Sequence, residues 1–210
     1  MPKRNIKKIY KKSSQPTDYF REYSKYLFHL LANLNFNTIE KVTKIILEKS
    51  KQGKTVFLAG NGGSAATASH FANDLSHGVL LKTKPLIKAV SLIDNIPLMT
   101  AISNDDGYEK VFTHQIRNLF KKGDILIAIS ASGNSPNVVE AVKLAKKIGG
   151  VTIGLVGFDG GKLAKICDYT IHVRTEKGQY GPVEDVHSFL NHMITSYLSL
   201  SLNKKKKYEK

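Results

Sequence analysis

The sequence predicts an α/β fold, a doubly wound parallel sheet flanked by helices and preceded by an N-terminal helical extension. Two continuous apolar runs of strand length, 56–59 and 125–129, have the pattern of strands buried on both faces of a parallel sheet. A turn rich in glycine and serine follows each run, and a stretch with helical spacing follows each turn. Strands that alternate with helices in this way form parallel sheets, whose ligands bind at the carboxyl ends of the strands.

The expected elements follow one another from the N-terminus. Apolar residues at helical spacing predict helices between about 16 and 50, with a break near 33–37. Strands are expected at 54–59, 87–91, 124–129, 151–156 and 168–173. Further helices are expected near 63–77, 95–103, 107–120, 135–147, 161–166 and 182–202, and the glycine-containing segment 174–183 is expected to be a loop.

One domain is expected, because a chain of 210 residues that is 41% apolar can bury a single core of this size. We assign residues 16–202 to this domain, residues 1–15 to a basic flexible tail, and residues 203–210 to a lysine-rich tail. The formal net charge is +15, and the two ends of the chain carry ten of these charges. Lysine runs at chain ends are most often solvated, so nucleic acid is not the expected partner.

The sequence also indicates a compartment. Cys167 is the only cysteine, which excludes an intramolecular disulfide and suits a reducing environment. No apolar run approaches the roughly 20 residues of a membrane span, and no signal-peptide pattern begins the sequence. We therefore expect a cytoplasmic protein without membrane contact.

The two turns, Gly60–Ser64 and Ser130–Ser135, have the features of phosphate-binding loops. Their glycines permit positive φ and close backbone approach, and the free amides of the following helix carry partial positive charge. Serine hydroxyls can donate to phosphate oxygens, although they can also simply cap the helix. Two such turns at equivalent places in the sheet favour a phosphate ligand. Neither turn has Walker A or Rossmann spacing, so a nucleoside triphosphate is not expected.

Polar residues near these turns are candidates for chemistry. His70 and Asp74 lie one helical turn apart, so their side chains share a face. They could bind a metal ion or form an acid/base pair, and they could equally be an ordinary surface pair. The last helix carries Glu184 near its start and His192 eight residues later. The helix dipole is sufficient to explain an acid at that end.

Several motifs occur together in order along the chain: Gly60-Asn61-Gly62-Gly63-Ser64, His70-Phe71-Ala72, Asn104-Asp105, Ser130-x-Ser132-Gly133-Asn134-Ser135, Asp159-Gly160-Gly161-Lys162 and Glu184-Asp185-Val186-His187. From about residue 16 to 200 the chain resembles the sugar isomerase (SIS) domain family, and more narrowly its phosphoheptose isomerase branch. The resemblance implies the SIS fold, a homotetramer, and interconversion of sedoheptulose 7-phosphate with D-glycero-D-manno-heptose 7-phosphate through proton transfer.

The same resemblance implies roles for single positions. One zinc ion per site would be held by His70, Asp74, Glu184 and His192, of which Asp74 and His192 also match the acid/base pair. The positions that match substrate-contacting residues are Asn61, Gly62, Gly63, Ser64, Asn104, Asp105, Ser130, Ala131, Ser132, Ser135 and Glu184.

Four places depart from the usual family pattern. Asp74 stands where Glu is usual and Glu184 where Gln is usual, while Gly78 replaces an arginine and Gly181-Pro182 replaces Asp-Arg. With the shorter carboxylate of Asp74, either the metal or the substrate lies closer to this helix, or proton transfer is compromised. The negative charge that Glu184 adds in place of Gln would favour binding of a cation and repel an anionic enediolate. These changes affect the sugar more than the reaction class.

Isomerisation needs a base, an acid and a group that stabilises the enediolate oxygen. We expect Asp74 and His192 to be these two groups and to act from opposite sides of the substrate. The imidazole of His192 suits this role because it exchanges protons near neutral pH. Eight residues separate Glu184 from His192, about 12 Å of helical rise, so one metal ion can hardly bind both from one straight helix. We therefore expect a site at a subunit boundary, with His192 or its neighbours reaching a site built mainly by another chain.

Two alternatives remain at this point. One is an isomerase of another sugar phosphate, and the other is a non-catalytic SIS protein that binds a phosphosugar as a signal. The presence of His70, Asp74 and His192 together favours an enzyme, because a binding protein has no need of this acid/base set.

Overall fold

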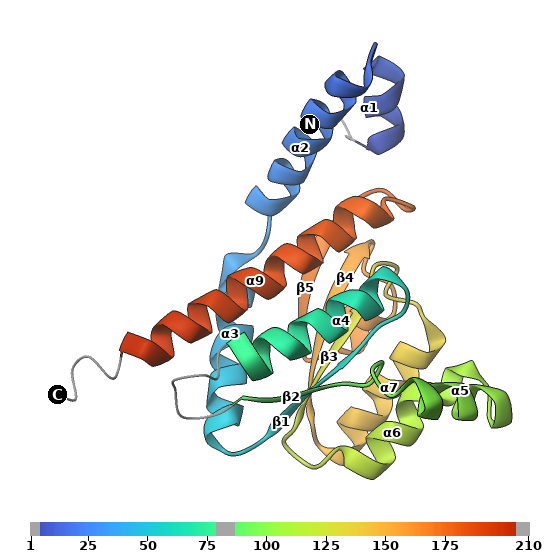
Figure 1. Cartoon of the computed structure of the whole chain (residues 1–210), viewed down its shortest axis with the longest axis vertical. Coiled ribbons are helices and arrows are strands. Elements are labelled where there is room, and N and C mark those ends of the chain that lie inside the picture. Colours follow the sequence, from blue (N-terminus) through green and yellow to red (C-terminus); the bar gives the residue numbers. More distant parts are fainter. Residues whose placement is uncertain (1–4, 79–86, 205–210) are drawn as a thin grey trace.

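The computed structural model describes residues 5–78 and 87–204, and its strands form one parallel sheet in the order β2-β1-β3-β4-β5 (Figure 1). Every neighbouring pair of strands in this sheet is parallel. The predicted doubly wound parallel sheet is therefore confirmed. The strands are β1 (Thr55–Ala59), β2 (Lys88–Ser91), β3 (Ile125–Ser130), β4 (Val151–Phe158) and β5 (Tyr169–Arg174).

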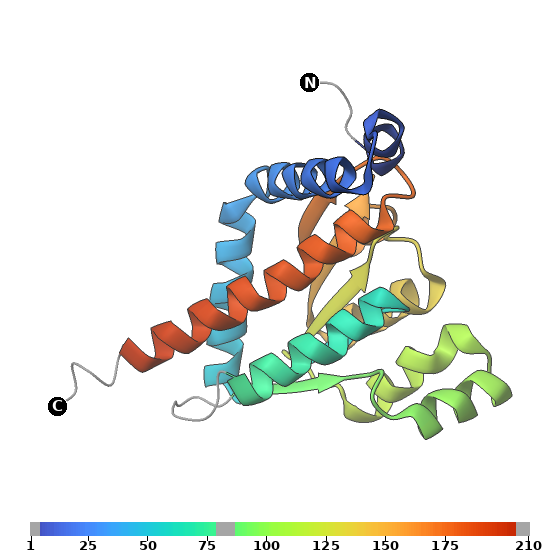
Figure 2. The same ribbon diagram turned by 45° about the horizontal axis from the view of Figure 1, so that its top comes forward.

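Helices cover both faces of the sheet (Figures 1 and 2). Those whose buried residues belong to the first core cluster are α1 (Ile6–Lys12), α2 (Pro16–Ala32), α3 (Phe36–Lys51), α4 (Gly63–Asn73) and α9 (Tyr180–Lys204). Those that contribute to the second cluster are α5 (Ile96–Asp105), α6 (Val111–Leu119), α7 (Pro136–Ile148) and α8 (Leu163–Ile166). Two short turns, η1 (Asp74–Gly78) and η2 (Tyr108–Lys110), complete the order.

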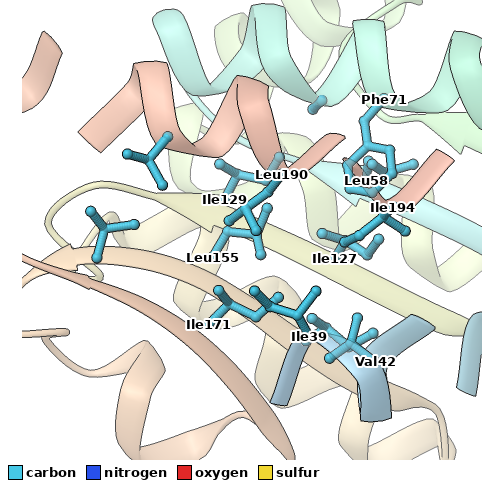
Figure 3. Close-up of a cluster of buried hydrophobic side chains, with 14 of the residues drawn as sticks. Ile39, Val42, Leu58, Phe71, Ile127, Ile129, Leu155, Ile171, Leu190 and Ile194 are labelled. Atoms are coloured by element: carbon cyan, nitrogen blue, oxygen red, sulfur yellow. The ribbon is translucent and has the colours of Figure 1, made fainter. Parts of the chain in front are cut away.

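The apolar strand runs divide their side chains between these two layers. On β1, Val56 and Leu58 belong to the first cluster, whereas Phe57 and Ala59 belong to the second. This alternation requires apolar residues at every position, which explains the unbroken runs in the sequence. Figure 3 shows the first cluster, in which Leu190 and Ile194 of α9 lie among side chains from the strands.

Helices α4 and α9 lie side by side over one face of the sheet (Figures 1 and 2). They run in the same direction, since the carboxylate of Glu184 lies against Gly63 and the side chain of Asn191 bonds Asp74 further along. Between these two contacts, Thr67 Oγ1 lies 3.4 Å from Ser188 Oγ. The helix pair therefore connects the first glycine-rich turn with the polar residues two turns beyond it.

The N-terminal segment differs from the expected tail, because residues 6–12 form α1. The side chain of Asn5 accepts a hydrogen bond from Lys8 N at 2.8 Å and caps this helix. Ile9 is buried, and the Ile6 amide donates to Gln179 Oε1 at 2.8 Å. A cap and an apolar pair at i and i+3 stabilise the helix against the segment before α9.

Element boundaries differ from the prediction by a few residues in most places. The helix expected over 63–77 ends as an α-helix at Asn73 and continues as the π-helical turn η1. The last helix starts earlier than expected, at Tyr180, and extends through Lys204, while residues 205–210 of the expected C-terminal tail lie outside the described residues. Within the described ranges, no helix combines the length and apolar character needed to cross a membrane.

Candidate functional site

The two glycine-rich turns lie side by side because β1 and β3 are neighbours with their carboxyl ends at one edge of the sheet. Asn61 of the first turn and Asn137 at the start of α7 exchange two hydrogen bonds, each 2.9 Å long. Tyr108 Oη donates to Asn61 Oδ1 at 2.9 Å. These contacts bring the first turn, α7 and η2 together into one polar edge.

The second turn gathers three hydroxyl groups at the N-terminus of α7. Ser130 Oγ lies 3.1 Å from Ser135 Oγ and 3.5 Å from Ser132 Oγ. Gly133 adopts a φ of 63°, and its amide donates to Ser130 Oγ at 3.2 Å. Hydroxyls and free helix amides in this arrangement can donate together to an anion. The intervening Ala131 is buried and bonds β4 through its carbonyl.

The first turn places backbone and an acid at the N-terminus of α4. Gly62 has a φ of 55° and precedes the helix, while Ser64 is buried in its first turn. A Cβ atom on Gly63 would overlap the carboxylate of Glu184, so glycine is required for this close approach. Burial, and then the charge of Asp185, raise the pKa of Glu184 above its usual value.

Further along the helix pair, three polar side chains converge. His70 Nε2 lies 3.3 Å and His192 Nε2 lies 3.7 Å from Asp74 Oδ2, and the two Nε2 atoms are 3.4 Å apart. The side chains of His70 and His192 are 48% and 62% exposed, which leaves the group open to solvent and substrate. We refer to His70, Asp74 and His192 as the histidine–aspartate cluster.

The cluster fits a divalent metal ion. Two imidazole nitrogens and one carboxylate oxygen are typical zinc ligands, and three protein ligands with an open fourth position are typical of catalytic zinc. Ligand atoms about 2.1 Å from a tetrahedral ion lie about 3.4 Å apart. The three separations in the cluster are 3.3, 3.4 and 3.7 Å, and all candidate ligand atoms lie within 4.8 Å of one another. The donor set and its spacing therefore agree with the implied metal.

The structure separates Glu184 from this cluster. Glu184 lies at Gly63, whereas the cluster lies about 10 Å further along α4, at seven residues of 1.5 Å rise. The metal-ligand set implied by the family resemblance is thus only partly brought together within one chain. Helix geometry is the reason, because residues eight apart on α9 cannot meet at one point.

Two further expectations about His192 need correction. His192 joins His70 and Asp74 of its own chain, so it does not need to reach a site built by another subunit. Asp74 and His192 also lie on the same side, 3.7 Å apart, instead of facing a substrate from opposite sides. Both differences arise because α4 and α9 are parallel neighbours, which the sequence did not reveal.

Asn104 and Asp105 lie apart from the other predicted residues. They are exposed at the end of α5, where Asn104 Nδ2 donates to Asp105 Oδ1 at 2.9 Å. Figures 1 and 2 place α5 at an outer edge of the molecule and not against α9. Within one chain these two residues therefore do not reach the histidine–aspartate cluster.

Sequence reasoning missed Asn137, Tyr108 and Asn191. Asn191 is fully buried, and its Nδ2 donates to Asp74 Oδ2 at 2.9 Å. A signal was present in the sequence, because Asn137 and Asn191 are polar residues at positions of helices that otherwise carry buried apolar residues. Tyr108 gave no comparable signal.

Comparisons with known proteins show the family to which the chain belongs. The SIS domain family model matches residues 18–157. The phosphoheptose isomerase of Aliarcobacter butzleri is 40% identical over 165 residues, which cover 79% of this chain and 86% of that protein. The phosphoheptose isomerase of Nitratiruptor sp. is 41% identical over 157 residues, or 75% of this chain and 82% of that protein.

Solved structures give the same result. A phosphoheptose isomerase from Neisseria gonorrhoeae superimposes with a TM-score of 0.76 at 31% identity, covering 87% of this chain and 95% of that one. A phosphoheptose isomerase from Francisella tularensis has a TM-score of 0.78 at 25% identity and covers 88% and 96% of the two chains. The chain is therefore similar to these proteins in both sequence and fold over most of its length.

Proposed function

The chain belongs to the phosphoheptose isomerase branch of the SIS-domain family, and from this membership we propose that it interconverts sedoheptulose 7-phosphate and D-glycero-D-manno-heptose 7-phosphate. The enzyme is an aldose–ketose isomerase that acts on a phosphosugar. The observation that carries this proposal is the histidine–aspartate cluster, which lies along the same helix pair as the glycine-rich turn.

We assign the two ends of the site to the phosphate and to the reacting carbons of the sugar phosphate. We assign the phosphate to the hydroxyls of Ser130, Ser132 and Ser135 at the N-terminus of α7. Seven single bonds join C2 to phosphorus and extend over about 8 Å, at about 3.5 Å for every three bonds of an extended chain. The cluster lies about 10 Å beyond Gly63 along α4. The length of the extended sugar chain is therefore of the same order as the separation between Gly63 and the cluster.

We propose that the cluster holds one zinc ion through His70 Nε2, Asp74 Oδ2 and His192 Nε2. Bound there, the metal would polarise the carbonyl group and orient the adjacent hydroxyl. The added negative charge of Glu184 lies at the other end of the helix pair, so it acts on the substrate and not as a ligand from the same chain.

Proton transfer is assigned to Asp74 and His192. Among the described residues, the second carboxylate oxygen of Asp74, Oδ1, receives a single long hydrogen bond of 3.4 Å from Asn73 Nδ2 and keeps acceptor capacity. We assign to Oδ1 the removal of a proton from C1 of the ketose and its return to C2. His192, exposed beside it, would exchange the proton between the oxygens on C1 and C2 through its other ring nitrogen, Nδ1, because Nε2 is the atom assigned to the metal. Both groups work from one face of the substrate.

A homotetramer with sites at subunit boundaries remains part of the proposal. Exposed apolar side chains on α9 follow one helix face at Phe189, Tyr197 and Leu200, and His192 lies beside this face. Exposed apolar stripes of this kind mark protein interfaces. Asn104 and Asp105, which do not reach the cluster of their own chain, would contact the sugar from a neighbouring subunit. Sedimentation velocity that shows a monomer at micromolar concentration would contradict this assembly.

The decisive experiment measures isomerisation directly. The purified protein is incubated in D₂O with sedoheptulose 7-phosphate and zinc, and aldose product is detected by NMR. We expect conversion with deuterium at C2 of the aldose, because a proton transferred through Asp74 exchanges with solvent. Conversion should be lost in Asp74→Asn and His192→Gln and retained in His77→Gln, a matched change of an exposed histidine outside the cluster.

Each other outcome of this experiment has a definite meaning. Product without deuterium would contradict proton transfer to an exchanging carboxylate. Conversion of a different ketose phosphate from a panel, with none of sedoheptulose 7-phosphate, would replace the substrate and keep the reaction. No conversion of any member, together with binding of phosphosugars, would favour the regulatory alternative.

A further inference from the structure

Asn191 is a buried polar residue that acts on the central oxygen of the histidine–aspartate cluster. Its side chain is 0% exposed, and its Nδ2 donates to Asp74 Oδ2 at 2.9 Å. The same Oδ2 faces Nε2 of His70 at 3.3 Å and Nε2 of His192 at 3.7 Å. The oxygen that faces both histidines is therefore also the oxygen that accepts the amide hydrogen bond.

The fold gains little from an amide at this position. Asn191 lies on the buried face of α9, beside Leu190 and Ile194, which pack in the core (Figure 3). Its Oδ1 is buried without a hydrogen-bond partner among the described residues. An unmade hydrogen bond of a buried amide lowers stability, and an apolar side chain of similar volume would avoid that cost. Its one side-chain hydrogen bond within those residues is the bond to Asp74.

Asp74 lies where such support has an effect. It is the first residue of η1, the π-helical turn in which the regular hydrogen bonding of α4 ends. Turns of this kind occur frequently at functional sites. Asn191 on the neighbouring helix supplies a short bond to Oδ2, whereas Asn73 supplies only the bond of 3.4 Å to Oδ1. Of these two hydrogen bonds to the carboxylate, the shorter one therefore comes from α9.

We propose that Asn191 is a positioning residue of the metal site, whose amide directs Asp74 Oδ2 toward the Nε2 atoms of His70 and His192 and so raises the affinity for a divalent transition-metal ion. This inference rests on the metal site of the proposed function. Groups that hydrogen-bond a ligating side chain typically contribute about 10- to 100-fold to metal affinity.

The test compares the native protein with Asn191→Leu, which removes the amide and keeps an apolar side chain of similar size. Cobalt(II) is titrated into each full-length protein and followed by visible absorption, and zinc affinity is measured by calorimetry. We expect cobalt affinity to fall about 10- to 100-fold. Without metal, the variant should unfold at the same temperature as the native protein or above it.

Two further variants separate positioning from structure. Thr195→Val is the matched control, because the hydroxyl of Thr195 donates to the carbonyl of Asn191 at 2.8 Å on the same helix without contacting Asp74. Its cobalt affinity should equal that of the native protein. In an Asp74→Asn background, adding Asn191→Leu should change cobalt affinity by less than twofold, since the carboxylate on which the amide acts has been removed.

Equal cobalt affinity of the native protein and Asn191→Leu would overturn the inference. A fall in affinity that merely follows the loss of folded protein would also overturn it, because it would assign Asn191 a structural role. If Asn191→Leu does not fold, Asn191→Ala takes its place under the same criteria. If the native protein binds neither cobalt nor zinc, the proposed metal site itself is overturned. This result differs from the outcomes above, in which the native protein binds metal and only the role of Asn191 is overturned.

Discussion

The buried imidazole of His187 makes the stability of this protein depend on pH in a predictable direction. His187 lies on α9 with 0% exposure, and neither ring nitrogen makes a hydrogen bond of regular geometry among the described residues, although the backbone of Val156 lies close enough to interact with the ring. Burial lowers its pKa from 6.5 to about 4, and the backbone of Val156 opposes this shift only in part. The folded protein therefore keeps the ring neutral at pH values where the unfolded chain binds a proton.

The size of the effect follows from the two pKa values of His187. Between them the unfolded chain binds more protons, so the free energy of unfolding increases with pH across this window and decreases on acidification. The lowering of the His187 pKa from 6.5 to about 4 corresponds to a loss of about 3 kcal/mol in the free energy of unfolding, at about 1.4 kcal/mol per pKa unit. The full loss is reached only below the lower pKa value. Between pH 7 and pH 5 the loss is about 2 kcal/mol.

The assay is urea unfolding of the native protein and His187→Leu at pH 7, 6 and 5, followed by circular dichroism. Leucine has a similar volume and removes both unbonded nitrogens, so the variant should be at least as stable at pH 7. Titrations shared by both proteins cancel in the difference between their free energies of unfolding. We expect this difference to grow by about 2 kcal/mol from pH 7 to pH 5. A difference that stays constant within about 0.5 kcal/mol would refute the reasoning.

Three further predictions concern backbone space and thiol chemistry. Gly133→Ala should lower the free energy of unfolding, measured by urea titration, by about 1–3 kcal/mol. The reason is that φ of Gly133 is 63° and a Cβ atom there would overlap the carbonyl of Gly160. An unchanged midpoint of urea unfolding would contradict this prediction. Gly63→Ala should displace the carboxylate of Glu184 and reduce kcat/KM about tenfold, while the melting temperature stays within a few degrees of the native value. Unchanged kinetics would contradict a role for Glu184 in binding the substrate. Burial, together with the charge of Asp168, raises the pKa of Cys167 to about 12. The thiol of the folded protein should therefore resist Ellman's reagent at pH 8 and react only after unfolding. Rapid modification of the folded protein would contradict this prediction.

Much of the fold could be predicted because its signals are local. The runs at β1 and β3 are apolar at every position since both faces of each strand are covered, and this pattern is visible without the structure. The turns after them carry the glycines and serines that the local backbone requires. The segment 6–12 was missed because its cap and apolar pair are short and lie within a lysine-rich stretch. Lysine content indicated solvation, whereas contacts with residues far along the chain stabilise the helix.

The sequence by itself determined the parallel sheet, the two turns rich in glycine and serine, and the pairing of His70 with Asp74, since each of these depends on residues a few positions apart. Only the tertiary structure decided that α9 runs parallel to α4. This packing brings His192 to Asp74 across 118 residues and leaves Glu184 at the glycine-rich turn. It also places Asn191 on the carboxylate. Contacts between distant segments depend on how helices pack across a sheet, and helical periodicity indicates which face is buried but not which residues of another helix meet it.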